Sequence, residues 1–225
     1  IITNPNTGEI LTLVSQPAFD PVNVGKAIVS EDRPLFDRAT AGTYPPGSVF
    51  KIVTALAGLE SGKINRYTEI EDVGEFELGG AKFSNWFYNQ YGGRDGLLKI
   101  DRAIARSNDI FFFRLAERTG LEPIRQMAIK FGFGQKTGID LSDEGLGLVP
   151  DEVWKKAAFK EGWFTGDTLH LGIGQGFLLA TPMQINSMTA YMASGKLLKP
   201  HLALEIKSGS GKVKIEDKIL ASNLV

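Results

Sequence analysis

Segments with helical periodicity alternate with short strand-like segments along this chain, and this alternation restricts the fold more than any other feature. Between 48 and 61 the apolar positions keep helical spacing, and Gly62 follows as a stop signal. The same pattern predicts helices over 100–106, 110–118, 122–131 and 181–193. Strand-like runs flank a turn within 1–14 and again within 202–215. Helices between scattered strands predict a mixed α+β domain.

The start of the 181–193 helix is the best specified of these boundaries. Thr181 is a favourable N-cap residue, Pro182 occupies the first turn, and Gln184 completes a capping box. Gly195 is the expected stop. By contrast, 16–43 is predicted to be a loop rich in Pro and Asp. The strand-like pieces within 63–98, separated by Gly pairs and aromatic residues, give no definite element assignment.

The composition excludes several functional classes. A chain of 225 residues favours one domain with a sizeable core. Its formal net charge of -1 and its scattered Lys and Arg residues argue against nucleic acid as a partner. The chain has no cysteine, and its two histidines, His170 and His201, lie far apart in the sequence. We therefore expect no metal ion, no cofactor and no Ser-His-Asp triad.

A serine and a lysine three residues apart stand at the start of the 48–61 helix. This spacing places Ser48 and Lys51 on one face of the helix. A serine hydroxyl needs a base, and a lysine can act as one when burial lowers its pKa. Phe50, Ile52 and Val53 are predicted to bury it, and the N–H groups of the helix start would face a developing oxyanion. The alternative interpretation of this short pattern is an N-cap serine followed by a solvated lysine.

A second polar cluster, Ser107-Asn108-Asp109, comes just before the 110–118 helix. In a functional interpretation, Ser107 passes a proton between Lys51 and a leaving amine, while Asp109 holds the lysine or a substrate amide. The alternative is structural, because a polar triplet before an apolar helix is a good capping sequence.

Taken together, the two clusters resemble a known signature. Ser-x-x-Lys followed by Ser-x-Asn is typical of penicillin-binding proteins and serine β-lactamases. Flanking segments resemble the transpeptidase domain of class B penicillin-binding proteins, occur in that family's order and cover nearly the whole chain. These segments are Asn4-Pro-Asn-Thr-Gly-Glu-Ile10, Gln16-Pro-Ala-Phe-Asp20, Tyr44-Pro-Pro-Gly-Ser-Val-Phe-Lys51, Gly132-Phe-Gly-Gln-Lys-Thr-Gly-Ile-Asp-Leu141, Gly174-Gln-Gly176 and Thr181-Pro-Met-Gln184. Asp109, where most of the family has Asn, is similar to the elongation-type penicillin-binding protein 2, as is the run containing Trp154, Trp163-Phe164 and Gly166-Asp167.

The resemblance implies a serine D,D-transpeptidase that cross-links peptidoglycan through an acyl-enzyme on Ser48. It implies a penicillin-binding protein/serine β-lactamase-like fold, with a helical cluster and an antiparallel sheet, over residues 1–225. β-Lactams would acylate the same serine and remain attached to it. The roles that it implies are catalytic for Ser48, Lys51 and Ser107 and substrate-binding for Asp109, Asn108, Trp86 and Gln175.

The same resemblance implies partners and a location. The expected partners are peptidoglycan stem peptides, β-lactam antibiotics and other proteins of cell-wall elongation. The expected location is the bacterial periplasm or the outer face of the cytoplasmic membrane. A membrane anchor and a non-catalytic module are expected N-terminal to this stretch.

The family also requires a Lys-Thr/Ser-Gly motif on a strand beside the pocket, and neither candidate here fits it. Lys136-Thr137-Gly138 precedes Gly174, whereas the family places the motif after that segment. Lys207-Ser208-Gly209 runs directly into Ser210-Gly211, so it is predicted to lie in a hairpin turn. We therefore expect the chain to stop before the third motif and the last strands of the domain.

Two other functional classes remain open. A D,D-carboxypeptidase or serine β-lactamase would use water as the acyl acceptor. A β-lactam sensor or a catalytically silent scaffold would be a binding module, and the presence of both Ser48 and Lys51 argues against silence.

The missing motif leads to a prediction about this stretch of chain. An incomplete sheet exposes apolar surface and an unpaired edge. We expect residues 1–225 alone to be labelled by a fluorescent penicillin much more weakly than the full-length protein. Equal labelling in a gel assay at matched concentrations would contradict the prediction.

Overall fold

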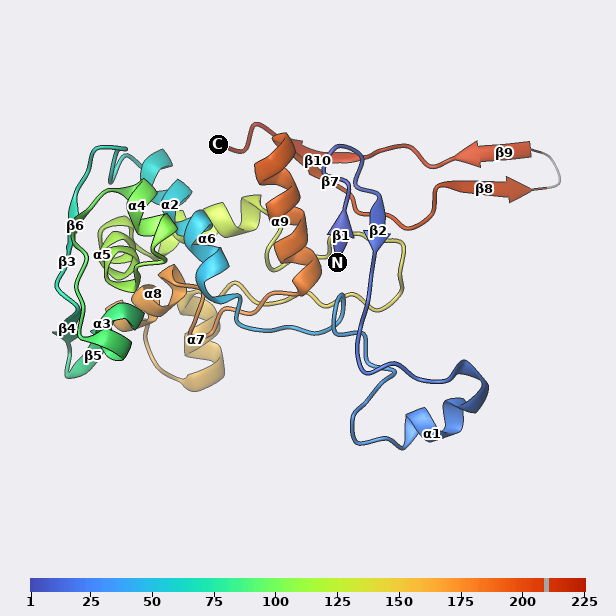
Figure 1. The fold of residues 1–225 in the computed structure, drawn as a ribbon, viewed down its shortest axis with the longest axis horizontal. Helices are drawn as coiled ribbons and strands as arrows, with labels where there is room; N and C mark the ends of the chain where they lie inside the picture. The colour runs from blue at the N-terminus through green and yellow to red at the C-terminus, as the bar shows by residue number, and fades with distance from the viewer. Residues whose placement is uncertain (209–210) are drawn as a thin grey trace. The chain divides into compact units, whose positions relative to one another are not determined.

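The computed structural model describes residues 1–208 and 211–225 (Figure 1). By internal contacts the chain divides into two compact units, each assembled from separate stretches of sequence. The first unit contains Ile1–Tyr44, Lys130–Leu148 and Leu179–Leu224. The second contains Pro45–Ile129, Val149–Leu178 and Val225. All of the predicted site residues belong to the second unit.

Helices and antiparallel strand pairs make up both units, which confirms the predicted α+β class. The first unit contains β1 (Ile2–Thr3), β2 (Ile10–Thr12), the 3-10 turn η1 (Pro21–Asn23), α1 (Val24–Ile28), α9 (Pro182–Ser194), β7 (Lys196–Leu198), β8 (Glu205–Ser208), β9 (Gly211–Lys214) and β10 (Ile219–Ser222). Its pairs are β1–β2, β7–β10 and β8–β9. In the described part of the chain each of these strands has two to four residues, and they form two-stranded antiparallel pairs.

The helix α9 begins as its sequence predicts. The Thr181 side chain accepts a hydrogen bond from the backbone N–H of Gln184, and the Gln184 side chain accepts one from the N–H of Thr181. The Gln184 amide also donates to two backbone carbonyls, at Gln135 and Leu146, which ties the helix start to a neighbouring loop. Met183 packs with Ile10 and other apolar residues in the core of this unit.

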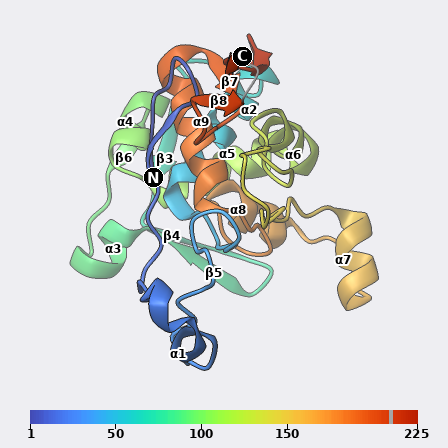
Figure 2. The ribbon, with the colours of Figure 1, turned by 90° about the vertical axis from the view of Figure 1, so that its right-hand side faces the viewer.

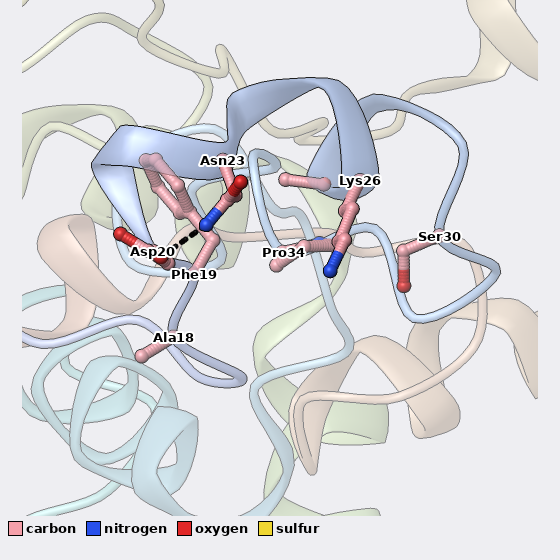
Figure 3. Close-up of a pocket in the computed structure, with 8 residues that line it drawn as sticks. Ala18, Phe19, Asp20, Asn23, Lys26, Ser30 and Pro34 are labelled. Carbon is pink, nitrogen blue, oxygen red and sulfur yellow. Dashed lines mark hydrogen bonds between the residues drawn. The ribbon is translucent and has the colours of Figure 1, made fainter.

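The 16–43 segment is not entirely the loop that was predicted, because it contains η1 and α1. Asp20 is the N-cap of η1, a helix-start signal that the prediction did not use. Its carboxylate accepts hydrogen bonds from the N–H of Val22 and from the side-chain amide of Asn23. Figure 3 shows the bond to Asn23. The segment surrounds a shallow pocket of about 310 Å³, whose lining includes Phe19 and Lys26. None of the predicted catalytic or substrate-binding residues lines this pocket.

The two rejected Lys-Thr/Ser-Gly candidates both belong to the first unit. Thr137 lies outside any strand and is buried, and its hydroxyl and N–H both donate to the carboxylate of Glu144. Lys207 lies on the strand β8 rather than in the turn, which corrects that prediction; it is exposed and pairs with Glu205 at 3.0 Å. The predicted hairpin within 202–215 is confirmed by the β8–β9 pairing. Gly209 and Ser210 lie outside the described residues.

The second unit holds most of the helices. It contains the 3-10 turn η2 (Gly47–Phe50), α2 (Lys51–Glu60), β3 (Ile70–Asp72), β4 (Glu75–Leu78), β5 (Ala81–Ser84), α3 (Trp86–Tyr91), β6 (Gly96–Leu98), α4 (Ile100–Ala105), α5 (Asp109–Thr119), α6 (Leu121–Lys130, except its last residue), α7 (Glu152–Phe159) and α8 (Thr165–Gly172). The helices predicted near 48, 100, 110 and 122 are confirmed, with the first shortened by the 3-10 turn. The helices α3, α7 and α8 were not predicted.

The central helix of this unit is α5, which packs against both α2 and α8 (Figure 1). Its sequence places Ile110, Phe111, Phe112 and Phe113 in succession, so it is apolar over most of its circumference at its N-terminal end and is buried there. Helix α8 approaches closely because Gly172 has no side chain, and a Cβ there would lie 2.4 Å from the Cβ of a residue on α5.

The unassigned 63–98 segment folds into two antiparallel pairs, β3–β6 and β4–β5 (Figure 2). Phe76 on β4 and Phe83 on β5 stack with ring centroids 5.4 Å apart, and both contact the ring of Phe113 on α5. Aromatic packing on α5 therefore decides the position of strands that have little periodicity of their own. None of the helices within 1–208 and 211–225 has the length and apolar composition needed to span a membrane.

Candidate active site

Ser48 lies in the 3-10 turn that leads into α2. The turn is fixed from outside by a hydrogen bond from the N–H of Gly47 to the carbonyl of Gly174, 2.8 Å long. Ser48 is exposed, and its hydroxyl makes no hydrogen bond to any residue that the structure describes. Because Phe50 is the N-cap of α2, the alternative role of Ser48 as an N-cap residue is not observed. The hydroxyl is therefore free to meet a substrate.

Lys51 occupies a buried position one turn further on, with 3% of its surface exposed. Its Nζ donates to the backbone carbonyl of Ser107 at 2.7 Å and to Oδ1 of Asp109 at 2.6 Å, and it lies 3.1 Å from the Ser107 hydroxyl. The Phe112 ring centroid is 5.6 Å away. The alternative of a solvated lysine is therefore not observed, because Lys51 itself is buried and its Nζ is held by groups of the protein.

Burial shifts the proton affinity of this lysine. Loss of hydration lowers the pKa of Lys51 from its ordinary value, and the attraction and hydrogen bond of Asp109 oppose this shift without cancelling it. Of the three residues predicted to bury it, Phe50 and Val53 are fully buried and Ile52 is partly buried, whereas the Phe112 ring was not anticipated. The lysine is thus easier to deprotonate than a surface lysine, which is what a base for serine requires.

Ser107 adopts an unusual backbone conformation between α4 and α5. Its φ is 48°, in the left-handed region that non-glycine residues rarely occupy. The conformation directs both the carbonyl and the hydroxyl of Ser107 to Lys51. Two backbone hydrogen bonds, from the N–H groups of Ser107 and Asn108 to carbonyls at the end of α4, hold the turn. Local strain of this kind is common where a functional group must be aimed.

The structure gives Asn108 a different position from the predicted substrate contact. Its side chain is completely buried and caps α5, with Oδ1 accepting from the N–H of Phe111 at 2.8 Å. Its amide donates to Asp72 at 2.8 Å and to Asp95 at 3.2 Å. The whole side chain is therefore engaged inside the protein, and the capping alternative from the sequence describes it better.

Asp109 and Trp86 lie next to each other. One carboxylate oxygen of Asp109 holds Lys51, and the other accepts a 3.4 Å hydrogen bond from the N–H of Trp86. The Trp86 indole donates to the carbonyl of Arg106 at 3.0 Å, and the Arg106 guanidinium lies over the Trp86 ring. Trp86 is half-buried, so part of its ring stays available at the surface.

Gln175 belongs to the exposed loop after α8, beside the turn that carries Ser48. A Cβ built on Gly47 would lie 3.5 Å from Nε2 of Gln175. The preceding residue, Gly174, has φ 74°, and a Cβ there would lie 2.2 Å from the carbonyl oxygen of Gly47. Only glycine therefore allows this loop to contact the turn that carries Ser48.

The structure brings most of the predicted site residues into contact, directly or through one neighbour. Lys51, Ser107 and Asp109 touch directly, Trp86 joins through Asp109, and Gln175 borders the Ser48 turn. The polar residues behind them, the buried Asp72 and Asn85 and the partly buried Asp95, were missed. Only the Asp-x-Gly turn signal at 72–74 was visible in the sequence, and it gives no indication of burial.

Comparison with known proteins identifies the family of the chain. The model of the penicillin binding protein transpeptidase domain matches residues 1–223, and the chain belongs to this family.

Individual relatives place the chain more closely. Peptidoglycan D,D-transpeptidase MrdA of Salmonella typhimurium is 35% identical over 221 residues, which are 93% of this chain and 35% of that protein. MrdA of Acinetobacter baumannii is 39% identical over 214 residues, covering 90% of this chain and 31% of the relative. The crystal structure of Pseudomonas aeruginosa PBP2 in complex with WCK 5153 superposes with a TM-score of 0.84 at 37% identity, covering 98% of this chain and 50% of that one. The predicted fold and the resemblance to penicillin-binding protein 2 are confirmed. The chain spans about a third of the length of these curated relatives.

The opposing effects of burial and of Asp109 on Lys51 give a prediction about pH. If free-base Lys51 activates Ser48, acylation by a penicillin rises with pH through the pKa of Lys51. Asp109→Asn removes the charge that raises this pKa, so the half-maximum of the pH–rate profile is expected at lower pH than in the wild type. Stopped-flow acylation kinetics of the full-length protein across a pH series measure it.

A closely matched control exists in the same unit. Lys155 is also 3% exposed and pairs with Asp167 at 2.6 Å. Asp167→Asn removes an equivalent carboxylate from a different lysine and is expected to leave the half-maximum where it is. An unchanged or higher half-maximum in Asp109→Asn would contradict the assigned role of Lys51.

Proposed function

We propose that this chain carries the acylation site of a peptidoglycan D,D-transpeptidase, with Ser48 as nucleophile and Lys51 as its base. The observation that carries the proposal is the burial of Lys51 against Ser107 and Asp109, one helical turn from a serine with a free hydroxyl. Burial in this arrangement lowers the pKa of Lys51, and the helical spacing places Lys51 where it can take the proton of the Ser48 hydroxyl.

The first half of the reaction forms the acyl-enzyme. Lys51 takes the proton of the Ser48 hydroxyl, and Oγ attacks the carbonyl of the penultimate D-alanine of a stem peptide. The resulting ammonium is stabilised by the Ser107 carbonyl and the Asp109 carboxylate. When the tetrahedral intermediate collapses, the peptide C–N bond breaks and the terminal D-alanine leaves as an amine. Its proton comes from Lys51 through the Ser107 hydroxyl, 3.1 Å from Nζ.

The second half transfers the acyl group. The amine of a neighbouring stem peptide attacks the ester carbonyl, and its proton passes through the Ser107 hydroxyl to Lys51. The bond between the acyl carbon and Oγ of Ser48 then breaks, and Lys51 returns the proton to Oγ to restore the hydroxyl. A β-lactam ring opens on Ser48 in the same way, but its leaving amine stays tethered. Trp86, which contacts Asp109, and Gln175, which borders the Ser48 turn, are the substrate-binding side chains of this proposal. Asn108 acts instead as a positioning residue.

The printed descriptions of relatives support the substrates and partners of this proposal. Mycobacterium tuberculosis penicillin-binding protein A was solved as a ceftriaxone acyl-enzyme, at 25% identity and a TM-score of 0.79. A Helicobacter pylori PBP2 was solved in a complex with MreC, at 36% identity and a TM-score of 0.76. We infer peptidoglycan stem peptides, β-lactams and cell-wall elongation proteins as partners. The site of action is then the periplasm or the outer face of the cytoplasmic membrane.

An acceptor assay tests the proposed reaction. The full-length protein is incubated with a stem peptide ending in D-Ala-D-Ala, with and without a second peptide bearing a free amine. We expect release of D-alanine together with a cross-linked product whose yield rises with acceptor concentration. Release of D-alanine with only a hydrolysed product would indicate a carboxypeptidase or β-lactamase type of enzyme. An acyl-enzyme that never transfers would indicate a sensor, and no acyl-enzyme would indicate a scaffold.

The base role of Lys51 leads to a separate prediction. Lys51→Arg keeps a cation for Asp109, but a guanidinium does not release its proton in proteins. We expect acylation by a penicillin to slow by roughly 10²- to 10⁴-fold, the range that general base catalysis provides. Lys155→Arg, at the matched buried pair, is expected to acylate at close to the wild-type rate. A wild-type rate in Lys51→Arg would refute the base assignment.

A further inference from the structure

A buried carboxylate lies directly behind the Ser107-Asn108-Asp109 turn. Asp72, at the end of β3, is 1% exposed. Its Oδ1 accepts a hydrogen bond from the N–H of Gly74 at 2.8 Å. Its Oδ2 accepts three more, from the Asn85 amide at 3.0 Å, the N–H of Asp95 at 2.9 Å and the Asn108 amide at 2.8 Å. Four donors thus converge on one carboxylate.

Within 1–208 and 211–225, no positively charged side chain forms an ion pair with Asp72, so burial of its charge requires well-placed hydrogen-bond donors. Among the described residues, neutral N–H groups alone offset its charge, and hydrogen bonds to a charged acceptor are roughly twice as strong as neutral ones. Removing the acceptor would leave several buried donors without partners, each of which carries a desolvation penalty. The positions of the donors are therefore coupled to Asp72.

Three of the four donors lead onward to the candidate active site. Asn108 caps α5 and directly follows Ser107, whose carbonyl holds Lys51. Asn85 accepts a 3.3 Å hydrogen bond from the N–H of Asp109 through its Oδ1. Asp95 pairs with the guanidinium of Arg106 at 3.1 Å.

The connection through Asp95 and Arg106 ends at Trp86, a proposed substrate-binding residue. The backbone carbonyl of Arg106 accepts the indole N–H of Trp86, and the guanidinium of Arg106 lies over the rings of Trp86 and Phe87. Asp72 therefore reaches Ser107, Asp109 and Trp86 by separate hydrogen-bonded connections, all within one compact unit.

We propose that Asp72 is a positioning residue that holds the Ser107 turn in its left-handed conformation and so aims the Ser107 acceptors at Lys51. The inference deepens the proposed function, on which it rests for the reaction that is being positioned. Asp72 itself makes no contact with Ser48 or Lys51 in the structure, so its influence is transmitted through Asn108 and Asn85.

The direct test is Asp72→Asn in the full-length protein, read out at Lys51. The substitution preserves size but turns an acceptor into an amide that faces three N–H donors. The Ser107 turn should then move, and protonated Lys51 should lose acceptors there. Among the described residues Asp109 is the charged group in contact with Lys51, and it is retained in this variant. We expect the titration midpoint of Lys51, followed by NMR of protein labelled with ¹³C at lysine Cε, to shift to lower pH.

Acylation by a penicillin provides the second readout. A misplaced Ser107 turn should slow acylation per folded molecule by roughly 10- to 100-fold, as expected for a displacement of about 1 Å at a catalytic group. Leu115→Ala, which creates a cavity on the same helix α5 away from the polar network, is the control for lost stability. It should lower the melting temperature but leave the Lys51 midpoint at the wild-type value.

A milder variant guards against loss of folding. Asp95→Asn keeps the backbone donor to Asp72 and weakens only the contacts with Asn108 and Arg106, so a smaller shift of the same sign is expected. An unshifted Lys51 midpoint in folded Asp72→Asn, or in Asp95→Asn should Asp72→Asn not fold, would overturn the inference. Because NMR reports on Lys51 without any reaction, a shifted midpoint in Asp72→Asn, together with a wild-type protein that does not acylate, would support the inference and refute the proposed function.

Discussion

The buried ion pair between Lys51 and Asp109 is the interaction on which the rest of the second unit depends. Moving a lysine from water to a position with 3% exposure carries a penalty of several kcal/mol, which only well-placed partners offset. The partners are Asp109 and the carbonyl of Ser107, and both belong to the start of a different helix from Lys51. Removing one partner of such a pair typically costs about 3–5 kcal/mol. The contacts that pack α2 against α5 therefore also bring Lys51, Ser107 and Asp109 together.

The same pair also sets a balance in the chemistry. Burial lowers the pKa of Lys51 and favours the free base, while Asp109 opposes that change and, in the proposed mechanism, stabilises the ammonium formed when Ser48 gives up its proton. Burial and a carboxylate are not sufficient by themselves. Lys155 has both, yet the residue three positions before it is Glu152, and the rings of Phe164 and Phe177 lie beside its Nζ. What distinguishes Lys51 is the exposed serine one turn before it.

The sequence predicted those parts of the molecule that are specified locally. The capped start of α9 at Thr181, the helical spacing after Ser48 and the polar triplet at 107–109 are all properties of neighbouring residues, and the structure contains each of them. The ordered family segments then supplied the functional meaning of Ser48 and Lys51, which the spacing alone left open.

The parts that were missed depend on contacts between distant residues. The strands of 63–98 are positioned by Phe113 and by the donors around Asp72, which come from several elements, so no window of sequence reveals them. The family resemblance implied a substrate contact for Asn108, whereas its side chain is buried and donates to Asp72, 36 residues away. The left-handed conformation of Ser107 is likewise imposed by its surroundings and not by its own preference.

The most direct test of the central claim is to locate the covalent bond. The full-length protein is treated with a penicillin, digested and analysed by peptide mapping in a mass spectrometer. The proposed mechanism predicts one adduct per molecule, on the Ser48 hydroxyl, and none on Ser107 despite its contact with Lys51. An adduct on Ser107 or on any other residue, with Ser48 unmodified, would contradict it.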